Sequence, residues 1–148
     1  MTSLETIREK LAITEPWVES RGAYWLNPGP SSVRDVAAVM IALGARFVTI
    51  TAYELPNGGG FRLEYHWDLT GNLLGFSFVI AGNSIESIYD LTEAADWIER
   101  EVHEGFAIHF TGREYEPLLL RPGDKLGVNL KEFSASAAEA PSQKEVAQ

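Results

Sequence analysis

An alternating polar row in residues 61–68 has the residue types that acid–base chemistry requires. Arg62, Glu64, His66 and Asp68 occupy every second position there, so they share one face of a predicted strand. A histidine between two carboxylates can act as a general base whose pKa its neighbours adjust. Alternate positions of a one-sided sheet are also polar wherever that side meets water. We interpret the row as a wetted or partner-facing surface. A stand-alone enzyme or small-ligand-binding domain that uses Glu64, His66 and Asp68 is the alternative.

A second set of candidate ligands lies farther along the chain, where Glu99 and His103 are four residues apart and His109 follows. Glutamate and histidine side chains can hold zinc or another transition metal. The zinc-protease spacing, in which two histidines four residues apart flank a glutamate, is absent. Glutamate and histidine at this spacing also pair on the surface of a helix. We therefore predict a surface pair and no metal site.

The charged run Glu99-Arg100-Glu101 follows Trp97 and precedes a segment rich in aromatic residues and glycine. A charge run on a helix is usually a solvated face. Charges beside bulky apolar residues are, however, candidates for buried and fully paired positions, and the planar guanidinium of arginine can bridge two carboxylates. We expect Glu99 and Glu101 to bracket Arg100 and so to order the junction between this helix and the following loop.

Composition excludes several classes of function. The chain has 148 residues, 21 acidic against 12 basic side chains and no cysteine. Disulfides, thiolate catalysis and ordinary iron–sulfur ligation are therefore excluded. The acidic balance argues against nucleic acid and anionic lipid, which select basic surfaces. Residues 57–60 are glycine-rich but lack the motifs of a phosphate or dinucleotide loop, so no cofactor is predicted. No signal peptide and no direct membrane insertion are expected.

The elements that must position these side chains follow from sequence periodicity. Capping signals at Thr2, Ser32 and Thr92 predict three helices. Strands are predicted at 23–26, 47–53, 61–68 and 73–81, with a further short one at 84–88. The order α-β-α-β-β-β-α predicts a two-layer α+β domain, with helices packed on one face of a mostly antiparallel sheet. We place this single domain at 1–130 and a disordered tail at 131–148.

Residues 95–112, with the sequence ADWIEREVHEGFAIHFTG, resemble the signature of the 30 kDa-type subunit of respiratory NADH:quinone oxidoreductase, complex I. The related subunit of energy-converting hydrogenases carries the same signature. The upstream strand at 61–68 also resembles the family, and the resemblance extends over about residues 30–120. The matching positions are Trp97, Glu99, Arg100, Glu101, Glu104, Ile108, Phe110 and Gly112.

The sequence departs from the family pattern at several positions. Ala107 stands where the family usually has glycine, and Gly105 stands where it has a large apolar residue. Arg113 replaces a histidine, and residues 116–118 replace a Leu-Arg-Arg stretch that meets neighbouring subunits in the family. The surface that follows the signature is therefore altered.

The resemblance implies a non-catalytic structural and assembly subunit that carries no redox centre. Such a subunit lies in the peripheral arm and docks on the hydrogenase-like large subunit, on the cytoplasmic side of the membrane. The signature positions would then form the family signature and partner interface. An accessory subunit of an energy-converting hydrogenase is an alternative, and the isolated chain could form a homodimer that covers a bare sheet face.

Overall fold

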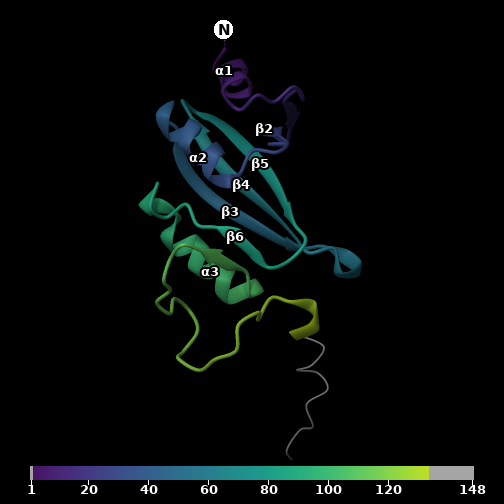
Figure 1. Ribbon diagram of the computed structural model, residues 1–148, viewed down its shortest axis with the longest axis vertical. Coiled ribbons are helices and arrows are strands. Elements are labelled where there is room, and N and C mark those ends of the chain that lie inside the picture. Colours follow the sequence, from purple (N-terminus) through teal and green to yellow (C-terminus); the bar gives the residue numbers. More distant parts are fainter. Residues whose placement is uncertain (1, 134–148) are drawn as a thin grey trace, which may run out of the picture.

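The structure is a computed structural model that describes residues 2–133. Its elements in chain order are α1 (Ser3–Lys10), β1 (Val18–Ser20), β2 (Ala23–Leu26), α2 (Val33–Ala42), β3 (Arg46–Glu54), η1 (Pro56–Gly58), β4 (Phe61–Leu69), β5 (Asn72–Ile80), β6 (Ser84–Glu86), η2 (Glu93–Ala95), α3 (Asp96–Phe106) and β7 (His109–Thr111). The predicted α+β class is confirmed, with the sheet and the helices arranged as Figure 1 shows.

The main sheet has five strands in the order β1-β2-β5-β4-β3. β3, β4 and β5 form the predicted antiparallel meander, in which the β4–β5 register runs from Phe61 opposite Ile80 to Leu69 opposite Asn72. β2 pairs with β5 in parallel, and β1 adds an antiparallel edge. The short strand predicted at 84–88 is present as β6, but it pairs in parallel with β7 in a separate two-stranded sheet.

Capping side chains set where α1 and α2 begin. Thr2 accepts a hydrogen bond from the backbone of Glu5, whose carboxylate accepts one from the backbone of Thr2. Ser32 and Asp35 form the same reciprocal box at the start of α2. Each box satisfies backbone N–H groups that the first helical turn leaves unpaired. Both predicted capping boxes are confirmed.

The third predicted cap is wrong. Thr92 precedes the 3₁₀ turn η2, and its side chain makes no capping hydrogen bond. The α-helical part, α3, begins only at Asp96. The intervening turn separates the Thr92 hydroxyl from the N–H groups of α3 that it would have capped.

The core lies between the sheet and the layer that contains α2 and α3 (Figure 1). The alternation of β4 puts Leu63, Tyr65 and Trp67 in this core, where they are nearly or fully inaccessible to solvent. Met40 of α2 and Val102 of α3 belong to the same apolar cluster. The opposite face of the sheet carries the polar row of β4.

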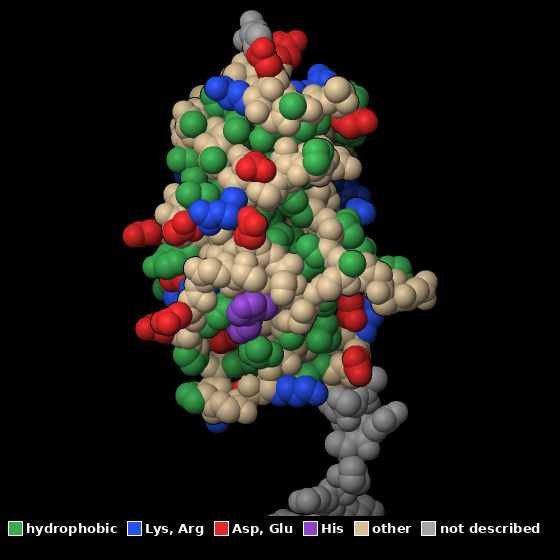
Figure 2. Space-filling view, viewed as in Figure 1, with side chains coloured by type: hydrophobic (Ala, Val, Ile, Leu, Met, Phe, Trp, Pro, Cys, Tyr) green, Lys and Arg blue, Asp and Glu red, His purple; other side chains and the backbone are tan. Residues whose placement is uncertain are grey.

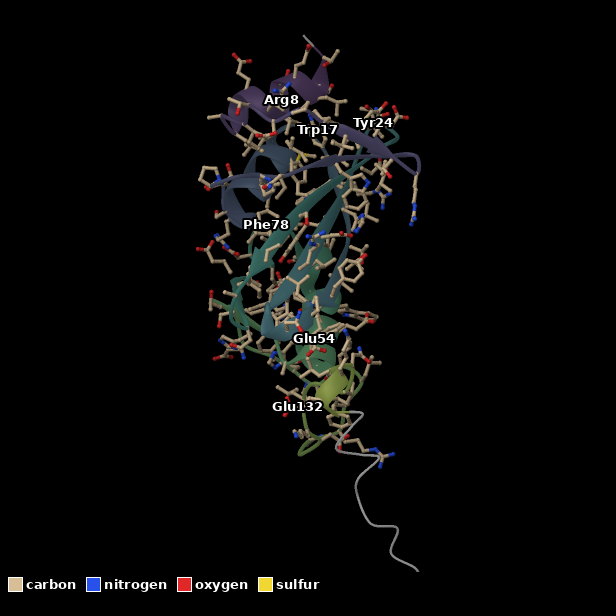
Figure 3. All side chains as sticks on the ribbon, turned by 90° about the vertical axis from the view of Figure 1, so that its right-hand side faces the viewer. Arg8, Trp17, Tyr24, Glu54, Phe78 and Glu132 are labelled. Carbon is tan, nitrogen blue, oxygen red and sulfur yellow. The ribbon has the colours of Figure 1, made fainter. Side chains whose placement is uncertain are left out.

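Only the beginning of the predicted disordered tail can be compared with the structure. The backbone N–H of Lys131 donates to a carboxylate oxygen of Glu54 at 2.9 Å. Figure 3 places Glu54 and Glu132 toward the end of the molecule opposite α1. Residues 134–148 of the predicted tail lie outside the described residues. No helix among residues 2–133 is both long and apolar enough to cross a membrane.

Candidate functional site

The carboxylates of the β4 row are engaged by other residues than His66. Glu64 accepts a hydrogen bond from the Tyr53 hydroxyl at 3.2 Å, and Asp68 forms a 3.2 Å ion pair with Arg46. Both partners lie on the neighbouring strand β3. Each charge is therefore satisfied across one strand pair, and the row does not form a histidine–carboxylate dyad.

His66 is held by packing and by a neutral hydroxyl. Its Nε2 lies 3.2 Å from the Thr51 Oγ1, and the Trp25 ring meets the imidazole edge-on at 5.4 Å between centroids. Gly75 makes room for this tryptophan, since a Cβ at Gly75 would lie 2.4 Å from the ring. Burial lowers the pKa of His66, and the charge of Glu64 opposes this shift only in part. The imidazole is therefore a packed part of the sheet face.

The second candidate cluster is centred on Glu99, a fully buried carboxylate on α3. One oxygen accepts a hydrogen bond from the Ile88 backbone N–H at 2.8 Å. The other accepts from the Ser87 hydroxyl at 2.7 Å and from Arg113 Nη1 at 3.1 Å. Glu99 therefore ties α3 to the segment after β6 and to the segment after β7. The predicted surface pair of Glu99 with His103 is wrong, because this carboxylate points into the interior.

Arg113 is the cation at the centre of this cluster, with a side chain that is 6% exposed. It binds Glu99 through one terminal nitrogen and Asp96 through the other. Arg100 pairs with the second oxygen of Asp96 at 2.9 Å, and Glu101 is exposed. The expected bracket of Arg100 by Glu99 and Glu101 is therefore wrong. Residues three or four apart share a helix face, so Asp96 can reach Arg100. Glu99 and Glu101, which adjoin Arg100 in the sequence, point in other directions.

Aromatic rings enclose the Arg113 guanidinium. Its central carbon lies 4.7 Å from the centroid of the Tyr89 ring and 4.9 Å from that of Tyr115. The Tyr115 hydroxyl accepts a hydrogen bond from the Phe110 backbone N–H at 2.6 Å, and burial raises the pKa of Tyr115 to about 12. On its other face Tyr115 stacks on His103, with centroids 3.9 Å apart. The cation is thus held by two carboxylates and two ring faces.

The two carboxylates of this cluster shift in opposite directions. Burial raises the pKa of Glu99, and hydrogen bonds from Ser87, Ile88 and Arg113 only partly offset it. Burial also acts to raise the pKa of Asp96, but the hydrogen bonds and charges of Arg113 and Arg100 outweigh it, so this pKa is lowered. Asp96 is therefore the carboxylate that the arginines hold most firmly in its ionised form.

Glu104, one and a half turns farther along α3, organises the loop that follows. Its carboxylate accepts hydrogen bonds from the backbone N–H groups of residues 118, 119 and 120, at 2.8, 2.9 and 3.2 Å. The backbone carbonyl of Glu104 accepts a further bond from Gly127 at 2.7 Å. Burial opposes ionisation, but these backbone donors lower the pKa of Glu104. A charged acceptor thus fixes a loop that has no regular secondary structure of its own.

Two departures from the family pattern lie where α3 meets this loop. A Cβ at Gly105 would lie 2.5 Å from the side-chain nitrogen of Asn129, whose backbone N–H donates to the Gly105 carbonyl at 2.7 Å. Ala107 ends the helix with φ 54° and ψ 31°, a left-handed conformation that glycine adopts more readily. The chain thus accepts backbone strain at Ala107 and uses the small Gly105 to bring the loop close.

The signature positions are divided between the interior and the surface. Trp97, 70% exposed, Glu101 and Gly112 lie on the surface, and Arg100 is partly buried. The remaining signature residues, Glu99, Glu104, Ile108 and Phe110, are buried. The buried members fix α3 and its loops within this chain, and the exposed members face solvent.

Sequence reasoning missed Arg113, Asp96 and Ser87 as members of the cluster. The replacement of the family histidine by Arg113 was the signal that could have indicated a new cation at this place. Within residues 2–133, no group of three histidine, aspartate or glutamate side chains is arranged to hold a metal ion. His103 and His109 lie 6.3 Å apart between ring centroids, and Glu99 faces Arg113 rather than either histidine.

Comparison with known proteins places the chain in a family. Residues 28–136 match the family model of the respiratory-chain NADH dehydrogenase 30 kDa subunit. A chain of the membrane-bound sulfane sulfur reductase, an archaeal respiratory membrane complex, is 18% identical with a TM-score of 0.69, over 97% of this chain and 92% of that one. The trypsin-resistant fragment of Nqo5 is 19% identical with a TM-score of 0.58, over 76% of this chain and 97% of that one.

These two structural likenesses show a shared fold, and no curated protein sequence matches the chain. The family match covers most of the chain and includes the whole signature at 95–112, so the resemblance seen in the sequence is confirmed. This chain belongs to the family of the 30 kDa subunit of respiratory-chain NADH dehydrogenase, complex I.

Proposed function

We propose that this protein is a non-catalytic docking and assembly subunit in the peripheral arm of an NADH:quinone oxidoreductase. It binds the hydrogenase-like large subunit on the cytoplasmic side of the membrane, where it is peripheral through its partners. It carries no redox centre itself, and the absence of cysteine from the sequence supports this part of the proposal.

The observation that carries the proposal is a pair of exposed apolar side chains on segments that the carboxylates of Asp96 and Glu104 hold in place. Trp97 is 70% exposed and directly follows Asp96, which two arginines bind. Leu119 is 73% exposed, and its backbone N–H donates to Glu104. Large side chains on pre-ordered segments lose little conformational entropy on binding, and tryptophan is common among the residues that dominate interfaces.

The face that carries α3 is compatible with such docking. Figure 2 shows hydrophobic side chains interspersed with acidic and basic ones on this side of the molecule. Apolar side chains among charges of both signs suit a partner with a complementary charge pattern, since complementary charge steers association and fixes its register.

The test is recovery of the complex from cells that express a tagged chain. We expect the wild-type chain to co-purify with the hydrogenase-like large subunit. Trp97→Asp should reduce that recovery at least tenfold, because it puts a charge at the centre of the contact. Ile41→Asp is the matched control, since Ile41 is an exposed apolar residue on another helix. Equal recovery of both variants and the wild type would contradict the proposed interface.

A second candidate is an accessory subunit of a hydrogenase-type membrane complex. The signature at 95–112 also resembles that of the related subunit of energy-converting hydrogenases, which makes this the runner-up. The large subunit that co-purifies with the tagged chain distinguishes the two parent complexes. A stand-alone enzyme is not favoured, because Glu64, His66 and Asp68 are each engaged by different neighbours.

A further inference from the structure

One stretch of β5 has a strand on only one side. β4 pairs with all of β5, from Asn72 to Ile80, whereas β2 pairs only with residues 73–76. Beyond this point the chain leaves the sheet through residues 27–30 and enters α2. In the part of the chain that the structure describes, the backbone of residues 77–80 makes no hydrogen bond outside the strand ladder with β4. Residues 77–80 thus form an open edge within the sheet.

A groove of about 900 Å³ follows this open edge. Its apolar lining includes Phe78, Val79 and Ile80 of β5, Ile85 of β6 and Val18 of β1. Figure 3 shows Phe78 midway along the molecule, between Trp17 and Glu54. The groove therefore occupies the place that a continuation of β2 would fill.

The open edge lacks the features that usually protect a strand from pairing. Residues 77–80 have the sequence Ser-Phe-Val-Ile, with no charge and no proline. Val79 and Val18 are both 58% exposed, which is unusual for apolar side chains that flank a groove. Aromatic and β-branched residues suit a strand. The backbone and the side chains of this edge are therefore suited to receive a further strand.

We propose that an extended segment of a partner subunit pairs with residues 77–80 and continues the line of β2. Backbone hydrogen bonds along the edge supply affinity, and alternate side chains of the incoming strand enter the groove. The acidic side chains of Glu15 and Glu86 outnumber the single cation, Arg62, in the lining of the groove. The incoming segment is therefore apolar in the middle and carries lysine or arginine where it passes these carboxylates. This inference rests on the proposed function, because the segment comes from a subunit of the same complex.

Hydrogen exchange measured by mass spectrometry on the intact complex and on the isolated chain tests the pairing directly. We expect the peptide that contains residues 77–80 to exchange at least tenfold more slowly in the complex, since the new strand protects its outward N–H groups. Equal exchange in a complex that retains the chain would overturn this inference and leave the proposed function standing. Failure of the wild-type chain to enter any complex would overturn both.

Two variants make the test specific. Val79→Lys should weaken recovery of the complex at least fivefold while leaving the melting temperature of the isolated chain unchanged, because Val79 is exposed in the free protein. Val48→Lys, at an exposed valine on β3, is the matched control and should have no effect. Wild-type recovery of Val79→Lys would contradict the inference.

The partner segment can be identified by site-specific crosslinking, because the chain has no cysteine of its own and an introduced thiol is therefore unique. Ser77→Cys introduces a single thiol on the open edge, to which a short photo-crosslinker can be attached. We expect a crosslink to a basic, strand-forming segment of another subunit in the assembled complex. A crosslink to a second copy of this chain, or a crosslink only to segments without strand character, would overturn the inference.

Discussion

The polar row of β4 and the charged residues of α3 both suggest chemistry in the sequence, yet the structure places their charges in different surroundings. On the sheet, Asp68 meets Arg46 across one strand pair, and the arginine is 70% exposed. Around α3, Arg113 is 6% exposed and joins Glu99 to Asp96. The first pair remains in water, whereas the second is part of the interior.

This difference shows that burial, not residue type, decides what a charged side chain does here. An exposed pair gains little because water screens it and its side chains lose entropy. A buried ion pair stabilises the fold no more than apolar packing of similar volume would. Removal of one partner, however, leaves an uncompensated charge in the interior and is strongly destabilising. The Arg113 cluster is therefore the more sensitive of the two regions, although it is not a reaction centre.

Replacement of Arg113 should give the largest effect. Arg113→Ala leaves Glu99 without a cation and Asp96 with only Arg100, so we expect the free energy of unfolding to fall by about 3–5 kcal/mol. Arg46→Ala removes the exposed pair and should cost about 0–1 kcal/mol. Urea denaturation of both variants measures the difference. Equal losses would show that the two regions are energetically alike and break the comparison.

Loss of the Glu104 carboxylate should have the next largest effect. Glu104→Gln keeps the shape of the side chain but replaces the charged acceptor of the N–H groups at residues 118–120. We therefore expect the free energy of unfolding to fall by about 2–3 kcal/mol. Limited proteolysis should then cut the 118–130 loop faster. Glu101→Gln, at an exposed position on the same helix, should change stability by less than about 0.5 kcal/mol. A stable Glu104→Gln variant with an uncut loop would contradict the anchoring role.

Local patterns predicted much of the fold but not all of its pairings. The strict alternation of 61–68 indicated both β4 and its buried face, and two capping boxes placed the starts of α1 and α2. β1 was missed because its three residues are all exposed and show no alternation. The parallel pairing of β2 with β5 was missed because it joins segments on either side of α2. Such pairing depends on tertiary structure, and no local period encodes it.

The candidate site was predicted only in part for a similar reason. The aromatic context of Glu99 correctly suggested a buried and paired position. Its partners, however, lie 12 and 14 residues away, at Ser87 and Arg113. Helical periodicity relates residues three or four positions apart, so it suggested His103 instead, and the contiguous charge run suggested Arg100. The cluster became visible only when the segments around α3 were placed in space.

The two buried glutamates of α3 should give opposite pH dependences. The pKa of Glu99 is raised above its ordinary value of 4.5, so the folded state binds the extra proton. The stability advantage of wild type over Glu99→Gln should therefore shrink as the pH rises from 4.5 through the folded pKa. The pKa of Glu104 is lowered below 4.5. The advantage of wild type over Glu104→Gln should be lost as the pH falls from 4.5 through the folded pKa.

Urea denaturation of the wild type and both variants over a series of pH values measures these slopes. Each glutamate is the control for the other, since they lie on one helix and differ in their partners. Parallel slopes would show that the donors around Glu99 and those around Glu104 stabilise the two carboxylate charges equally. That outcome would contradict the opposite shifts.

The smallest expected effect concerns the backbone conformation of Ala107, the residue that ends α3. Ala107 has φ 54°, and a left-handed alanine costs about 1–2 kcal/mol. Glycine removes this strain, but its greater conformational entropy stabilises the unfolded chain by about 0.4–1 kcal/mol. Ala107→Gly should therefore stabilise the protein by about 0.5–1 kcal/mol. Ala38→Gly, at an exposed position inside α2, should instead destabilise it by about 0.5–1 kcal/mol. A loss of stability in both variants would mean that the Ala107 methyl group, near Gly127 in the anchored loop, contributes more by packing than its backbone loses by strain.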